Sequence, residues 1–170
     1  MEANKLAEPW LRGTLAEVPA VPRAVLHALE LAEEDLKRWC GTLSDAELNA
    51  RPAGIAPVAF HLRHIARSVD RLLTYAEANE LNDAQIAAMK SESDAGAKRE
   101  ELFAELDTAL HGGAERIRAF DVGRFNEARV VGKKELPSTL GGLLVHVADH
   151  TQRHVGQAVT TSKIVSAQHS

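Results

Sequence analysis

The chain has 170 residues, of which 45% are hydrophobic and 26% are charged. This length suits a single domain with a sizeable core, and the composition excludes intrinsic disorder for the bulk of the chain. The formal net charge of −4 argues against a nucleic-acid-binding protein, because such proteins usually carry a basic patch.

Residues 1–20 are expected to form an irregular leader, because Pro9 and Pro19 interrupt any helix there. A first long helix is predicted to begin near Pro22, which suits the first turn of a helix, and to stop at Gly41. Its apolar residues recur at helical spacing and are Val25, Leu26, Leu29, Leu36 and Trp39.

Residues 41–56 are expected to form a connection with one short helical turn, because Ser44 and Glu47 have the spacing of a capping box. Pro57 is then predicted to begin a second long helix that runs to about Glu77. The apolar residues of this helix include Phe60, Ile65, Leu72 and Leu73.

The pair Asn82–Asp83 is expected to cap a short helix that ends near Met89. A third long helix is predicted over residues 98–120, with an inward face formed by Leu102, Leu106, Leu110, Ile117 and Phe120. Residues 121–137 are typical of a long connection, in which residues 130–131 suit at most a short extended piece.

Ser138 is predicted to cap a fourth long helix, from Thr139 to about Val165. Gly141 and Gly142 near its start each cost about 1 kcal/mol relative to Ala in a helix interior, so we expect a neighbouring element to approach closely there. Four amphipathic helices without a clear strand pattern predict an all-α fold, namely a four-helix bundle.

The predicted bundle spans residues 21–165, between the leader (1–20) and a C-terminal tail (166–170). The single cysteine, Cys40, cannot form an intramolecular disulfide and is expected to be a small buried side chain, which favours a cytoplasmic protein. No run of about 18 apolar residues occurs, so we expect no membrane span and no membrane partner.

Histidine is concentrated in the predicted helices, with five of the eight residues in two short segments. The fourth helix contains LLVHVADHTQRHVGQ, which places three of them at positions i, i+4 and i+8: His146, His150 and His154. Two histidines four residues apart can bind the same metal ion. The outer two are about 12 Å apart along the helix axis, so one adjacent pair is expected to share an ion.

The second helix can supply a third ligand, because FHLRHIARS places His61 and His64 at positions i and i+3. Two imidazoles from the fourth helix and one from the second would leave open positions for water or substrate, as catalytic metal sites do. The spacing alone leaves open which adjacent pair, and which of His61 and His64, takes part. The other histidines are expected to be surface or hydrogen-bonded residues, and they are His27, His111 and His169.

The segment LPSTLGGLLVHVADHTQRHVGQAV resembles the last helix of the DinB/YfiT superfamily of metalloenzymes, and RPAGIAPVAFHLRHIARSVDRLL resembles their second helix. The resemblance extends over residues 21–165 and implies a four-helix bundle that holds one divalent metal ion through three histidines. Matching the motifs residue by residue indicates that the ligands are His64, His150 and His154. The candidates for lining the pocket or contacting the ligands are His61, His146 and Gln157. Asp70 and Asp149 are candidate carboxylate partners of the ligands if they face inward.

Characterised relatives in this family include transferases and isomerases that use low-molecular-weight bacterial thiols. The resemblance therefore implies metal-assisted transfer of such a thiol to a small-molecule substrate. A metal-dependent hydrolase and a non-catalytic, stress-related metal-binding protein are the alternatives. In either enzyme, the metal-bound thiol or water is the only catalytic group that can be assigned. Three imidazoles accept Zn, Ni, Fe, Mn or Co, so the sequence does not identify the metal. Alanine-rich helix faces suit a homodimer.

Overall fold

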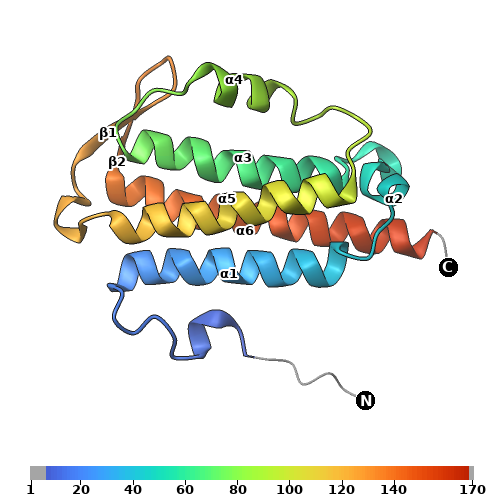
Figure 1. The fold of residues 1–170 in the computed structure, drawn as a ribbon, viewed down its shortest axis with the longest axis horizontal. Helices are drawn as coiled ribbons and strands as arrows, with labels where there is room; N and C mark the ends of the chain where they lie inside the picture. The colour runs from blue at the N-terminus through green and yellow to red at the C-terminus, as the bar shows by residue number, and fades with distance from the viewer. Residues whose placement is uncertain (1–6, 169–170) are drawn as a thin grey trace.

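The computed structural model describes residues 7–168. Residues 1–6 of the expected leader and residues 169–170 of the expected tail, among them His169, lie outside the described residues. The described chain forms six α-helices and one small antiparallel sheet. Four long helices run alongside one another (Figure 1), and they are α1 (Ala20–Cys40), α3 (Val58–Ala76), α5 (Arg99–Ala119) and α6 (Leu140–Ala167).

The short elements lie in the connections between the long helices. Helix α2 (Asp45–Asn49) follows α1, and α4 (Asp83–Lys90) lies outside the long helices, beside α3 (Figure 1). Three single 3₁₀ turns complete the helical elements of residues 7–168, at Pro9–Leu11, Pro52–Gly54 and Val122–Arg124. None of the described residues of α4 is buried, so polar contacts rather than a hydrophobic face hold it in place.

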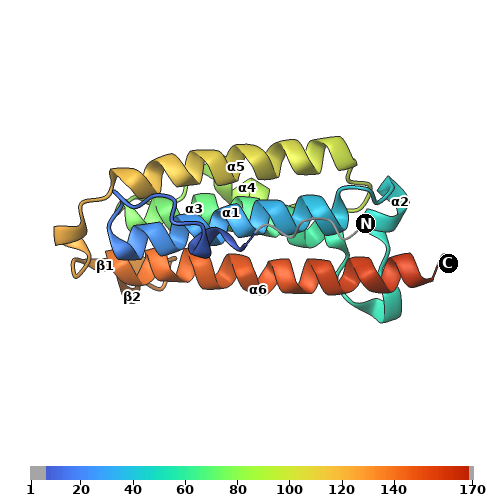
Figure 2. The same ribbon diagram turned by 90° about the horizontal axis from the view of Figure 1, so that it is seen from below.

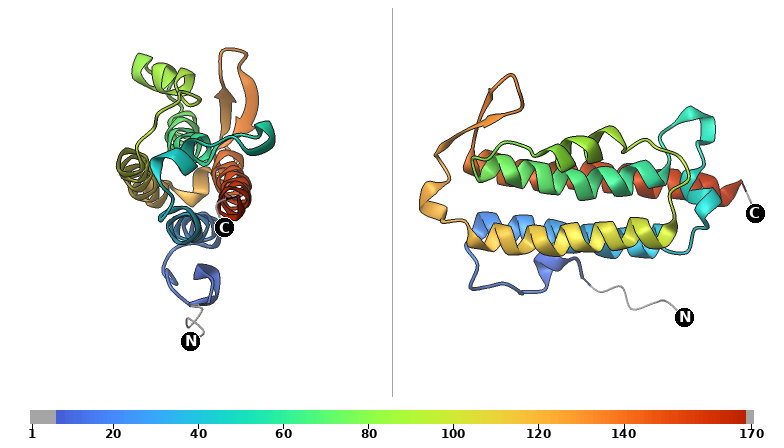
Figure 3. Two further views of the ribbon diagram at one scale, coloured as in Figure 1. Left: turned by 90° about the vertical axis from the view of Figure 1, so that its right-hand side faces the viewer. Right: turned by 45° about the horizontal axis from the view of Figure 1, so that its top comes forward.

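The hydrophobic core lies between the four long helices, which keep a common direction in Figure 2 and surround one interior in the end-on view of Figure 3. Helix α6 packs against both α1 and α3, and α3 also packs against α5. The largest fully buried side chains include Leu26, Leu36, Leu62, Ile65, Leu73, Leu106, Ile117 and Leu144. Helical spacing of Leu, Ile and Val thus builds the core, as the sequence predicts.

The predicted helix limits differ from the observed limits by one or two residues. The capping box before α2 is confirmed, because Ser44 Oγ accepts from the Glu47 amide at 3.3 Å and Glu47 accepts from the Ser44 amide at 2.8 Å. Asn82 and Gln85 form the same motif before α4. Trp39 is not part of the core, since it is 37% exposed and Lys163 Nζ lies 4.2 Å from its ring centroid.

The predicted all-α fold holds for the long helices, and a two-stranded sheet in the connection before α6 adds to it. Strand β1 (Ala128–Val131) pairs with β2 (Leu136–Thr139), with Val131 opposite Leu136. Gly132 and Glu135 adopt positive φ values of 69° and 49° and allow the chain to turn between the strands. Both strands are short, and Pro137 argues against a strand, so the sequence pattern for this hairpin is weak.

The N-cap of α6 is Thr139 and not Ser138, because Thr139 Oγ1 accepts from the Gly142 amide at 3.0 Å. Ser138 belongs instead to β2. The expected close approach at Gly141 is confirmed, since a Cβ atom there would lie 3.1 Å from the Phe125 Cβ atom and 3.2 Å from its carbonyl oxygen.

The adjacent residues Gly112 and Gly113 in α5 should respond to alanine with opposite signs. A Cβ atom on Gly113 would lie 2.7 Å from Val69 Cγ1, whereas one on Gly112 would meet no atom within 4 Å. We expect Gly113→Ala to lower the free energy of unfolding by about 1–3 kcal/mol through overpacking. Gly112→Ala should raise it by up to about 1 kcal/mol through helix propensity. Urea unfolding of both variants measures this, and equal effects would contradict the packing of α5 on α3.

Within the described residues, no helix combines the length and the apolar character that crossing a membrane requires.

Candidate metal centre

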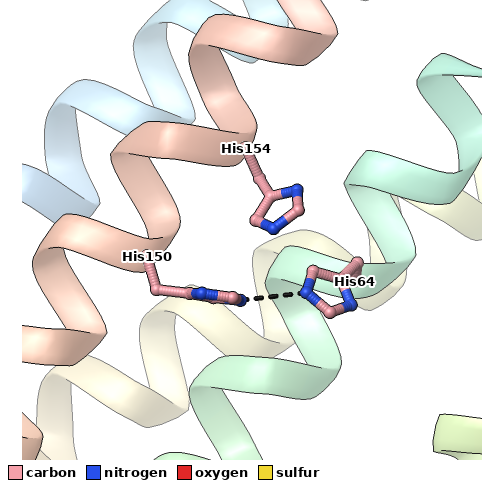
Figure 4. A group of neighbouring side chains, drawn as sticks. All are labelled: His64, His150 and His154. Atoms are coloured by element: carbon pink, nitrogen blue, oxygen red, sulfur yellow. Dashed lines mark hydrogen bonds between the residues drawn. The ribbon is translucent and has the colours of Figure 1, made fainter. Parts of the chain in front are cut away.

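Three histidines from two helices converge on one point between α3 and α6 (Figure 4). His64 comes from α3, and His150 and His154 come from successive turns of α6. One ring nitrogen of each lies within 4.8 Å of the other two. The Nε2 atoms of His64 and His150 are 2.9 Å apart, and the His154 ring centroid lies 4.3 Å from that of His64.

Local sequence explains why these side chains meet. On α6, buried Val147, Thr151 and Val155 alternate with the histidines, so the histidine stripe borders the face that packs on α3. On α3, Leu62 and Ile65 are fully buried on either side of His64. Packing of the two apolar faces therefore brings imidazoles that are 86 residues apart in the chain into contact.

The arrangement fits a single metal ion. Three imidazole nitrogens at about 2.0–2.1 Å from a tetrahedral ion would be about 3.4 Å apart. This lies between the 2.9 Å separation of His64 and His150 and the 4.8 Å limit on the group. Among the described residues the group has three members, so a bound ion would keep a coordination position for water or substrate.

Burial keeps His61, His150 and His154 in the form that binds metals. Loss of solvent, followed by repulsion from neighbouring imidazoles, lowers the pKa of His61, His150 and His154 to about 4. These rings are therefore neutral at pH 7, and a neutral imidazole has a free nitrogen lone pair.

The three pocket candidates have different environments. His61 is 5% exposed, and its Nδ1 atom lies 3.1 Å from Nδ1 of His154, so it packs directly behind this histidine. His146 is partly exposed, and its ring centroid lies 5.3 Å from that of His150. Gln157 is exposed on α6, beyond His154. Of the three, His61 is the buried one, and it contacts one of the three clustered histidines.

A carboxylate that the sequence did not single out contacts the cluster. Oε2 of Glu92 lies 2.7 Å from His64 Nδ1, and its Oε1 accepts from Arg71 Nη1 at 2.5 Å. Burial acts to raise the pKa of Glu92, but the hydrogen bonds from His64 and Arg71 outweigh it and lower this pKa. Glu92 follows His64 by 28 residues in a polar connection, where no sequence signal distinguishes it from a solvated charge.

The two aspartates that were candidate partners of the ligands have other contacts. Asp149 is exposed and lies 2.8 Å from His146 Nδ1. Asp70 pairs with Arg116 at 2.8 Å. The carboxylate beside the cluster is thus supplied by the connection after α4 and not by α3 or α6.

His27, His111 and Cys40 behave as expected. His27 is buried, and its Nε2 atom lies 3.2 Å from Thr14 Oγ1. His111 is exposed, with Nδ1 lying 2.8 Å from the Asp107 carbonyl oxygen. Cys40 is fully buried, and this burial raises its thiol pKa to about 11, which leaves it protonated at pH 7.

The metal-free protein is expected to lose stability as the pH falls from about 6.5 to about 4. The pKa of His150 and His154 is about 4 in the folded chain, against an ordinary 6.5, so the unfolded chain binds protons first. Thermal melting in the presence of a chelator measures this loss. Replacing both residues by Gln should make the loss shallower, whereas His111→Gln should not. An unchanged pH dependence in the double variant would contradict the burial of these rings.

Comparison with known proteins adds a family and a fold. A family model described as the DinB superfamily matches residues 28–158. The structure is similar to the crystal structure of a conserved protein from Enterococcus faecalis, with a TM-score of 0.73 and 18% identity. The alignment covers 88% of this chain and 99% of that chain, and at this identity it shows a shared fold alone. No curated protein matches the chain.

Proposed function

This chain belongs to the DinB superfamily, and on that premise we propose that it is a divalent-metal-dependent enzyme with His64, His150 and His154 as the metal ligands. The observation that carries the proposal is the meeting of three imidazole nitrogens within 4.8 Å. In the proposed domain, residues 21–165 form a four-helix bundle of the DinB/YfiT type, flanked by the leader (1–20) and the tail (166–170).

The proposed reaction is transfer of a low-molecular-weight thiol to an electrophilic small molecule. A divalent ion at this centre would lower the pKa of a thiol that binds at its open position. The sulfur would form the new bond to the electrophilic carbon while the bond from that carbon to its leaving group breaks, as when an aryl halide releases halide, and the thiol proton would pass to solvent. Support for a thiol comes from the family resemblance, and support for an open position comes from the three-membered ligand group.

The surrounding residues would orient the ligands and limit solvent. Phe60 stacks on His64, with ring centroids 5.2 Å apart and an interplanar angle of 18°. His61 closes the cluster on the side of His154. Phe60 and His61 both come from α3. This helix would therefore provide one ligand and two of the side chains that pack around the metal centre.

We expect metal-dependent consumption of cysteine-derived thiols when the protein is incubated with an activated aryl halide. The test compares the protein loaded with each divalent metal, the chelated protein and the His150→Ala variant. Thiol conjugation that disappears in the last two samples supports the proposal. Hydrolysis of activated esters without thiol conjugation would assign the hydrolase alternative. If the metal-loaded protein shows neither thiol conjugation nor ester hydrolysis, the result would assign a non-catalytic metal-binding role.

A further inference from the structure

Glu92 is the buried acidic residue that connects the segment after α4 with the proposed metal centre. It is 7% exposed, and its two oxygens contact different partners. Oε2 lies 2.7 Å from His64 Nδ1, while Oε1 accepts from Arg71 Nη1 at 2.5 Å. Arg71 is itself held by a second hydrogen bond, from Nη2 to Ser68 Oγ at 3.1 Å. The carboxylate is thus fixed in orientation by two groups from α3.

The residues on both sides of Glu92 are also held by α3. Arg67 Nη1 lies 3.0 Å from Ser91 Oγ, immediately before Glu92. Arg63 Nη1 donates to the Asp94 carbonyl oxygen at 2.7 Å, two residues after it. These bonds hold an otherwise exposed connection against the helix, so Glu92 presents its carboxylate to His64 from a fixed position.

The contact with Glu92 selects one form of the His64 ring. A neutral imidazole carries its proton on one nitrogen, and a carboxylate beside Nδ1 favours the proton there. The lone pair is then on Nε2, which is the atom that faces His150 at 2.9 Å. Phe60 stacks on the same ring and restricts its rotation.

We propose that Glu92 is a positioning residue of the metal centre, which holds His64 in the Nδ1-protonated form so that Nε2 binds the ion. The proposal rests on the metal-binding function proposed above. Carboxylates that accept from a metal-bound histidine orient its ring and increase its basicity, and their loss usually weakens metal binding about 10- to 100-fold. Arg71 has a supporting role, because it fixes the second oxygen of Glu92.

The test is a Zn²⁺ titration of the full chain with Glu92→Ala, Glu92→Gln and a control. We expect Glu92→Ala to raise the Kd for Zn²⁺ about 10- to 100-fold. Glu92→Gln should have a smaller effect, because its amide oxygen can still accept from His64 Nδ1. The control is Glu77→Gln, which removes a similar Arg–Glu pair, with Arg116 at 2.7 Å, at the far end of α3. It should leave the Kd within about twofold of wild type, as expected for an ion pair without contact to the ligands.

A second measurement separates positioning from a general loss of stability. Nitrogen-15 NMR of the metal-free protein should show His64 protonated at Nδ1 in wild type and in Glu77→Gln. In Glu92→Ala the proton should redistribute toward Nε2. Circular dichroism and thermal melting report whether the variants are folded, and Glu92→Gln carries the test if Glu92→Ala does not fold.

The outcomes distinguish this proposal from the one on which it rests. A wild-type protein that binds no Zn²⁺ would overturn the proposed metal function and, with it, the role of Glu92. A wild-type protein that binds Zn²⁺, with both Glu92 variants within about twofold, would overturn the positioning role alone. Protonation of His64 at Nε2 in the metal-free wild type would also overturn it.

Discussion

Replacing any one of the three clustered histidines by alanine is expected to abolish stoichiometric binding of a divalent metal ion. His64→Ala, His150→Ala and His154→Ala each reduce the proposed donor set from three nitrogens to two. His64→Ala leaves two ligands on α6, whereas His150→Ala and His154→Ala each leave one ligand on α3 and one on α6. The effect should be close to complete, because protein metal sites with an open position typically depend on three protein ligands. Elemental analysis and Zn²⁺ titration measure the change.

Two control variants show whether such a loss is specific. His111→Ala removes an exposed histidine, and His27→Ala removes a buried one that pairs with Thr14. Both should bind about as much metal as wild type. If one of the three cluster variants retained full metal content, that residue would not be a ligand, and His61 or His146 would be the next candidate on the same helix.

Removal of metal is expected to lower the melting temperature of wild type markedly. A ligand that binds only the folded chain, at roughly 1,000 times its Kd, stabilises by about 4 kcal/mol. For a chain of this size, this corresponds to about 8–16 °C in melting temperature. The ion would join α3 to α6, so the stabilisation should extend to the packing between these helices.

The matched experiment is a set of thermal melts with and without chelator. Wild type should melt at the lower temperature in the presence of chelator, and His150→Ala should melt at the same temperature in both conditions. A shift of equal size in His150→Ala would place the stabilising ion elsewhere in the chain.

The long helices could be predicted from the sequence because their signals are local. Apolar residues at helical spacing continue over five or more turns in α1 and α3, and residues with defined capping geometry mark α2 and α4. The N-cap of α6 lies one residue after the predicted one, because Ser138 and Thr139 are adjacent and both residue types are good caps. The sequence pattern does not predict the small sheet, since its two four-residue strands depend on pairing with each other.

The candidate site was predictable only in part, for a similar reason. Helical spacing placed histidines on one face of α6 and one face of α3, but it could not choose between His61 and His64. The family motif indicated His64, and the structure brings this residue together with His150 and His154. Their assignment as ligands is still a prediction. Glu92 could not be found, because its contact with His64 arises from the return of the connection after α4 across α3.

The most direct test of the metal centre is anomalous diffraction from crystals of the protein reconstituted with Zn²⁺. We predict one anomalous peak per chain between α3 and α6, about 2.0–2.1 Å from one nitrogen of each of His64, His150 and His154. A Zn²⁺ ion bound by other side chains, or no anomalous peak between these histidines after reconstitution, would contradict the proposed centre.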